Sequence, residues 1–209
     1  VFLQLFFIGQ WMYGVAGICL FEMLNPFVEL AFGKKYLFPV EVVLVLCVNF
    51  SINGAKKSVT IFKESMGLFW NDRYKAIVEA VLNLGISVAL VVRLGVTGVF
   101  LGTIFSMLLT SVWIEPYVIY EHSFERSPAE FFLTYGKNLV VMGLVWLCTN
   151  YCCMIFRGGA FVNLIFRMCV CVVVPNVLLW LAYRRSEEWK RLFELMKKIV
   201  IKVRGKIKG

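Results

Sequence analysis

The sequence is poor in charge and almost lacks histidine, and these shortages exclude most classes of enzyme. Charged residues make up only 17% of the 209 residues, whereas a soluble domain carries about a quarter. His122 is the single histidine, and the seven cysteines lie far from it inside apolar runs, unlike the ligands of a zinc site. The chain also lacks a Gly-Lys-Ser/Thr phosphate loop, a serine nucleophile elbow and any His-based acid–base pair. We therefore expect neither enzymatic activity nor a bound metal or cofactor.

Long apolar runs take the place of the missing charge. Hydrophobic residues make up 60% of the chain, its mean hydropathy is +0.79, and no linker rich in charge or in Ser, Gly and Pro divides it. A membrane-spanning helix needs about 20 apolar residues, and six runs meet this need: 2–24, 37–62, 74–94, 98–120, 131–156 and 160–183. The sequence therefore predicts an all-α membrane protein with a polytopic domain over residues 1–183. Since residue 1 is a valine that already lies in an apolar run, we expect the chain to be the C-terminal fragment of a longer protein.

Residues 184–209 differ from the rest by being basic and amphipathic. Ten of the 22 Lys and Arg residues lie here, opposite a face of apolar residues at helical spacing. Loops rich in Lys and Arg stay in the cytoplasm, so we predict a cytoplasmic C-terminus, with the region of Lys56 to Lys75 on the same side. The apolar face and the adjoining membrane helix argue against nucleic acid as a partner.

A basic amphipathic helix beside a membrane is typical of binding to anionic lipid. The alternative is a basic anchor that only sets the orientation of the chain. The residues that we expect to contact the membrane surface are Arg184, Arg185, Lys190, Arg191, Lys197 and Lys198.

The third apolar run carries a stripe of polar side chains. Glu79, Asn83 and Ser87 follow one another at intervals of four residues, so they lie on one face of a helix. Polar groups in hydrocarbon usually face a bundle interior or a water-filled cavity, while Asn and Ser also join helices through modest hydrogen bonds. Both readings stay open. Glu79 is near enough to the helix start to reach the interface or to pair with Arg73 or Lys75.

Two arginines and a proline are the other unusual residues of the apolar runs. Arg93 ends the third run, where it is either an interfacial anchor or a contact for substrate. Arg167 lies inside the sixth run and either reaches outward to the interface or belongs to a transport pathway. Pro116 is expected to kink the fourth helix near its end.

Three stretches together resemble a known family of transporters. They are NPFVELAFGKKYLFP (25–39), GLFWNDRYKAIVEAVLNLGISVALV (67–91) and LGVTGVFLGTIFSMLLTSVWIEPYVIYEHSF (94–124). In order and spacing they resemble the C-terminal half of the Wzx-type bacterial polysaccharide (O-antigen) flippases of the multidrug/oligosaccharidyl-lipid/polysaccharide exporter superfamily. The resemblance implies a bundle of twelve to fourteen helices in two lobes, of which these six helices form the C-terminal part.

The resemblance also implies a substrate and a mechanism. An undecaprenyl-pyrophosphate-linked oligosaccharide would cross the bacterial cytoplasmic membrane by alternating access through a cavity between the lobes. Under this reading we expect Glu79, Asn83 and Arg93 on the cavity side, with Arg93 as a phosphate contact because its guanidinium is a bidentate donor.

Two rival functions remain at this point. In a cation-coupled multidrug exporter of the same superfamily, Glu79 would carry the proton or sodium ion. In a membrane scaffold without transport, the basic tail would recruit polysaccharide-synthesis enzymes.

Overall fold

A computed structural model describes residues 2–124, 127–156, 158–186 and 189–190 of the chain. These residues are almost entirely helical, and no strand occurs among them. The helices are α1 (Phe2–Phe32), α2 (Val40–Ser65), α3 (Lys75–Leu94), α4 (Val96–Leu109), α5 (Ser111–Ile119), α6 (Ala129–Ile155) and α7 (Ala160–Tyr183), with a π-helical turn, η3 (Tyr120–Phe124), after α5. Six helical segments, counting Val96–Phe124 as one, are long and apolar enough to cross a membrane. The prediction of an all-α membrane protein is confirmed.

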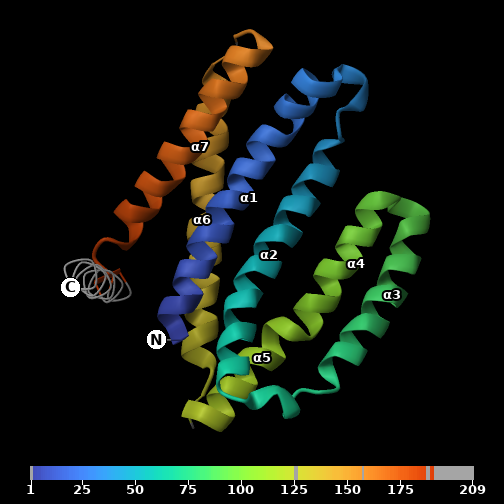
Figure 1. Cartoon of the computed structure of the whole chain (residues 1–209), viewed down its shortest axis with the longest axis vertical. Coiled ribbons are helices and arrows are strands. Elements are labelled where there is room, and N and C mark those ends of the chain that lie inside the picture. The colour runs from blue at the N-terminus through green and yellow to red at the C-terminus, as the bar shows by residue number, and fades with distance from the viewer. Residues whose placement is uncertain (1, 125–126, 157, 187–188, 191–209) are drawn as a thin grey trace, which may run out of the picture.

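Helix α1 is the centre of the arrangement. Figure 1 shows it between the α6–α7 pair on one side and α2 on the other, with the α3–α4 hairpin beyond α2. We call the end of the bundle that holds the α2–α3 connection and α5 the lower end, as it is drawn in Figure 1. The charge distribution predicts that this end faces the cytoplasm. Large apolar side chains stay exposed along the outer faces, as expected where helices meet lipid tails.

The observed helices differ from the predicted runs mainly at their ends. Helix α1 extends eight residues beyond Leu24, the predicted end, and contains Pro26. Asn25, beside this proline, donates to the carbonyl of Phe38 at 2.9 Å and accepts from its amide at 3.1 Å, which fixes the return into α2. Membrane helices tolerate an internal proline when neighbouring groups satisfy the freed backbone. The carbonyl of Glu22, which Pro26 leaves without its helical partner, accepts from Arg167 Nη1 at 3.2 Å, and the helix continues through Pro26.

The fourth run is not one helix with a kink at its proline. It breaks at Thr110, where φ is −123° and ψ is −87°, six residues before Pro116. Helix α5 therefore starts with its own orientation and places Ser111 and Glu115 inside the bundle, both nearly without exposed surface. This break positions two of the polar groups described below.

Close contacts through glycine hold neighbouring helices together. A Cβ atom built on Gly54 of α2 would lie 2.0 Å from the ring of Tyr13 in α1, and one on Gly9 would lie 1.9 Å from Ser58 Oγ. In the hairpin, a Cβ on Gly102 of α4 would lie 2.8 Å from the backbone of Ser87 in α3. Small residues let membrane helices approach to this distance, where van der Waals packing stabilises them.

Replacing Gly102 by alanine is expected to loosen the α3–α4 hairpin. The new methyl group would overlap backbone atoms of Ser87, which no rotamer change relieves, so we expect a loss of about 1–3 kcal/mol. The matched control is Gly85→Ala in α3, because nothing lies within 4 Å of its Cβ position. Thermal unfolding in detergent should separate the two variants; equal melting temperatures would contradict this packing.

Part of the basic C-terminal segment lies among the described residues. The guanidinium of Arg184 lies over the ring of Trp180 at 5.7 Å, and the ring of Trp189 stacks on Trp11 of α1 at 5.3 Å. Three of the residues expected at the membrane surface, Arg191, Lys197 and Lys198, lie outside the described residues. Arg185 and Lys190 lie within them. The expected amphipathic helix over 184–209 stays a prediction.

Candidate functional site

Six charged side chains meet between α2, α3 and α5 at the lower end of the bundle, and we call them the ion-pair cluster. Helix α2 supplies Lys56 and Lys63, and α5 supplies Glu115. The remaining members are Lys75 and Glu79 of α3 and Asp72, which precedes that helix. With three lysines and three carboxylates the cluster has no net formal charge. Buried charges are tolerated when they are paired in this way.

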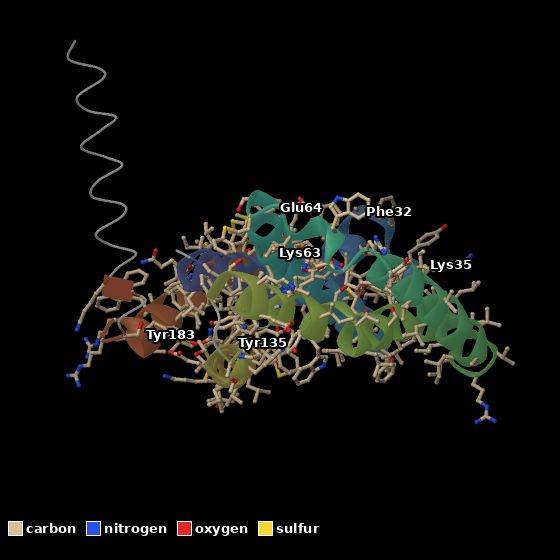
Figure 2. The ribbon with its side chains drawn as sticks, turned by 90° about the horizontal axis from the view of Figure 1, so that it is seen from below. Phe32, Lys35, Lys63, Glu64, Tyr135 and Tyr183 are labelled. Atoms are coloured by element: carbon tan, nitrogen blue, oxygen red, sulfur yellow. The ribbon has the colours of Figure 1, made fainter. Side chains whose placement is uncertain are left out.

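The inner part of the cluster is almost closed to solvent. Lys63 and Lys75 donate to Asp72 and to Glu115, respectively. Two longer pairs connect them crosswise, Lys63 Nζ to Glu115 Oε1 at 3.9 Å and Lys75 Nζ to Asp72 Oδ2 at 3.3 Å. The side chain of Glu115 is only 1% exposed, and its second oxygen accepts from Thr60 Oγ1 at 2.7 Å. Seen from below in Figure 2, Lys63 lies toward the middle of the bundle and its neighbour Glu64 at the edge.

The outer part of the cluster is the pair of Lys56 and Glu79. Lys56 Nζ donates to Glu79 Oε1 at 3.0 Å, and both side chains are about one-fifth exposed, at 21% and 20%. The other carboxylate oxygen accepts from the Ser111 hydroxyl and lies 3.2 Å from Thr110 Oγ1. This pair is therefore the part of the cluster that solvent reaches most easily.

Of the two alternatives for Glu79, the one in which it pairs with Arg73 or Lys75 is wrong. Neither Arg73 nor Lys75 pairs with it: Lys75 reaches Glu115 and Asp72 instead, and Arg73 lies over the rings of Trp70 and Tyr74. The observed partner, Lys56, is 23 residues away in sequence on a different helix. Closeness along the chain favoured the local lysine, whereas the packing of α3 on α2 and α5 brings the distant one into reach.

An open groove of about 400 Å³ lies beside the cluster on the α1–α2 face. Two of its polar residues, Asn53 and Lys57 of α2, are exposed, and Asn53 also donates to Asn49 Oδ1 at 2.7 Å. The side chain of Lys57 makes no ion pair or hydrogen bond with any other described residue. The residues lining the groove are Tyr13, Phe50, Asn53, Gly54, Lys56, Lys57 and Thr60.

The predicted Glu79–Asn83–Ser87 stripe is divided between two surroundings. Glu79 belongs to the ion-pair cluster, while Asn83 Oδ1 accepts from Ser87 Oγ at 2.9 Å. Ser87 packs against Gly102 of α4 and lies 3.3 Å from the carbonyl oxygen of Val99. The structure thus places the upper part of the stripe against a neighbouring helix, as the packing alternative predicts.

Arg93 and Arg167 lie in different settings. Arg93 is exposed at the upper end of α3, about 27 Å along the helix from Lys75 at 1.5 Å per residue, and makes no ion pair among the described residues. Its role as a substrate contact stays a prediction. Arg167 of α7 instead turns inward, where its Nη1 lies 3.0 Å from Glu22 Oε2 and 3.2 Å from the Glu22 carbonyl oxygen. Asn150 of α6 donates to Glu22 Oε1 at 2.7 Å.

Sequence reasoning missed most of the groove and of the cluster. Lys56, Lys63 and Lys75 were interpreted only as charges that set topology, although the predicted runs 37–62 and 74–94 contain Lys56 and Lys75. The structure pairs all three with carboxylates. A signal was available, because Asn49, Asn53, Lys56, Lys57 and Thr60 recur at helical spacing along α2. No comparable signal links Glu22 to Arg167, which are 145 residues apart.

Among the described residues, no three His, Cys, Asp or Glu side chains come together as a metal ion would need. Comparisons of the chain with models of protein families, with curated proteins and with solved structures give no match.

Proposed function

We propose that the chain is the C-terminal part of a flippase that moves lipid-linked oligosaccharides across the bacterial cytoplasmic membrane, with its C-terminus in the cytoplasm. The resemblance of residues 25–39, 67–91 and 94–124 to Wzx-type flippases supports this proposal. The observation that carries it is the groove, because a membrane-spanning helix presents polar side chains there to open space.

The position of Asn53 explains why this groove is not an ordinary lipid-facing surface. Asn53 lies 12 residues before the end of α2 at Ser65, which is about 18 Å along the helix axis. Its side chain is exposed to the open groove. Polar residues within a membrane-spanning helix usually face a cavity filled with water or a polar substrate. The groove therefore has the character of a transport path along α2.

Positive charge in the groove fits an anionic headgroup. Lys57 is exposed and free of carboxylate partners among the described residues, and Lys56 lies one residue before it on the same groove wall. Lysine binds phosphate as a point charge, through charge-assisted hydrogen bonds. In this proposal the pyrophosphate of the substrate meets these two lysines while the groove faces the second lobe of the transporter.

Replacing Lys57 by glutamine is expected to slow translocation by about tenfold or more, because a lost charge-assisted hydrogen bond is worth about 1.5–3 kcal/mol. The measurement is the export of labelled repeat units in cells that carry the variant in the full protein. The matched control is Lys35→Gln, an exposed lysine between α1 and α2 at the other end of the bundle, which should export at the unaltered rate.

Export at the unaltered rate by the Lys57→Gln variant would overturn the assignment of the groove. The cation-coupled drug exporter predicts a different pattern, namely efflux of a cationic dye that depends on Glu79 and not on Lys57. No feature of the described residues points to a cationic substrate, since the exposed charged side chain in the groove is that of Lys57.

A further inference from the structure

We propose that Lys56 couples the binding of a phosphate anion in the groove to the uptake of a proton by Glu79. This inference deepens the proposed function and rests on it in one respect, that the groove receives the phosphate of the substrate. The chemistry is that of a phosphate group, whether it belongs to a lipid headgroup or is free in solution.

Lys56 is placed to serve both the groove and the ion-pair cluster. Its side chain lines the open groove together with Lys57, and on its other side it borders a small cavity of about 20 Å³ that Ser111 and Glu115 also line. Its Nζ is at the same time the cationic partner of Glu79 at 3.0 Å. An anion that enters the groove therefore competes with Glu79 for this ammonium group.

In the inner part of the cluster, no ammonium group is open to an anion in the groove. The Glu115 and Asp72 carboxylates are 1% and 4% exposed, and both are held by Lys63 and Lys75, neither of which lines the groove. Among the ion pairs of the cluster, only that of Lys56 and Glu79 includes a residue of the groove. An arriving anion thus perturbs one pair and leaves the others in place.

The loss of Lys56 leaves Glu79 without the one cationic partner that it has among the described residues. The groups that face its carboxylate from other helices are Lys56 of α2 and the hydroxyls of Thr110 and Ser111 at the start of α5. Helix α4 has no ionisable side chain. On α3 itself, Lys75 lies one turn away but donates to Glu115, the single carboxylate of α5.

Protonation of Glu79 directly restores the charge neutrality of the cluster. The cluster is neutral as three lysines and three carboxylates, so withdrawing one ammonium group to an anion leaves one unpaired negative charge. An unpaired carboxylate in a low-dielectric site takes up a proton rather than stay charged. The neutral Glu79 carboxyl can still hydrogen-bond to Ser111 and Thr110, whose oxygens also accept. Anion binding and proton uptake are then linked one to one.

The test uses the purified protein in lipid nanodiscs and isothermal titration calorimetry. Inorganic pyrophosphate is the soluble ligand and farnesyl pyrophosphate the lipid one, with farnesol as the control without phosphate. Titrations in two buffers with different heats of protonation count the protons taken up. Pyrophosphate itself titrates in this range, so the Glu79→Gln variant with the same ligand provides the baseline.

We expect the unaltered protein to take up about one proton more per bound pyrophosphate than Glu79→Gln does. Its dissociation constant should rise by up to about tenfold per pH unit relative to that of the variant, as one-proton linkage requires. Glu79→Gln should bind more tightly at pH 8, because Lys56 is then already free. Lys56→Gln should bind weakly and without the extra proton, and Lys35→Gln should behave as the unaltered protein.

Each contrary result has a distinct meaning. Equal proton uptake by the unaltered protein and by Glu79→Gln, or weaker binding to that variant, overturns the coupling while leaving the groove and the flippase function standing. Absence of binding to either pyrophosphate overturns the coupling and the proposed function together. Binding of farnesyl pyrophosphate alone, with the extra proton, supports the coupling and identifies a lipid headgroup as the source of the phosphate.

Discussion

A protein in which Glu115 is replaced by glutamine is expected to unfold at a markedly lower temperature than the unaltered protein. Glu115 is 1% exposed and accepts from Lys75 and Thr60, with Lys63 Nζ 3.9 Å away. An amide in its place leaves two buried lysines with Asp72 as their only inner carboxylate. Removing one partner of a buried ion pair costs about 3–5 kcal/mol. We expect this variant to have the largest effect of any change within the cluster.

Glu64→Gln is the matched control for this prediction. Glu64 is also a glutamate near the lower end but is exposed (Figure 2), and losing an exposed charge costs about 0–1 kcal/mol. Thermal unfolding in detergent, followed by circular dichroism, gives the comparison. A Lys75→Met/Glu115→Met double variant should lose less stability than the two single variants added together. If Glu115→Gln and Glu64→Gln have the same melting temperature, the cluster does not stabilise the lower end of the bundle.

Replacing Arg167 by glutamine should destabilise the attachment of α7 to α1 by a similar amount. Arg167 is the cationic partner of Glu22, whose side chain is 1% exposed and also accepts from the amide of Asn150. Without the guanidinium a buried carboxylate lies unpaired in the membrane-spanning part, so the expected loss is again about 3–5 kcal/mol. Arg93→Gln, which removes an exposed arginine from the end of α3, should leave the melting temperature unchanged.

A Glu22→Gln/Arg167→Gln double variant distinguishes a direct pair from two independent losses. When both charges are removed, no unpaired ion remains, so the double variant should be more stable than Arg167→Gln alone. The melting temperatures of the two single variants and the double variant form the thermodynamic cycle. Simple additivity of the two losses would contradict a direct interaction between Glu22 and Arg167.

The fold class could be predicted from the sequence because it depends on composition over long windows. Runs of about 20 apolar residues specify helices in a membrane, since no other open structure satisfies the backbone there. The predicted ends of the helices were less accurate. The interaction of Asn25 with Phe38 and the break at Thr110 depend on tertiary contacts and on backbone geometry that hydropathy does not contain.

The candidate site was predicted only in part, for a physical reason. Glu79 was singled out as an unusual group, but its partner was sought close to it in sequence, where sequence distance is a useful guide. Between helices, the partner depends on the rotation and depth of each helix. These follow from packing such as that of Gly54 on Tyr13. Glu115 is buried for the same reason, because the break at Thr110 gives α5 its own orientation.

The groove was within reach of sequence reasoning. The spacing of Asn49, Asn53, Lys56, Lys57 and Thr60 marks one side of α2 as polar by the same periodicity that identified the stripe of α3. This polar side was missed because the lysines were counted only as signals for the orientation of the chain. Helical periodicity should therefore be examined for charged residues near the ends of apolar runs before they are assigned to loops.

The neutrality of the ion-pair cluster also matters while the chain is being made. Helix α2 leaves the ribosome with Lys56 and Lys63 before any of their carboxylate partners exists, because Asp72, Glu79 and Glu115 come later in the chain. Lys56 and Lys63 lie nine and two residues before the end of α2 at Ser65, where long lysine side chains can reach the interface. The positive charge of α2 is therefore neutralised by carboxylates only after α3 and α5 have been made.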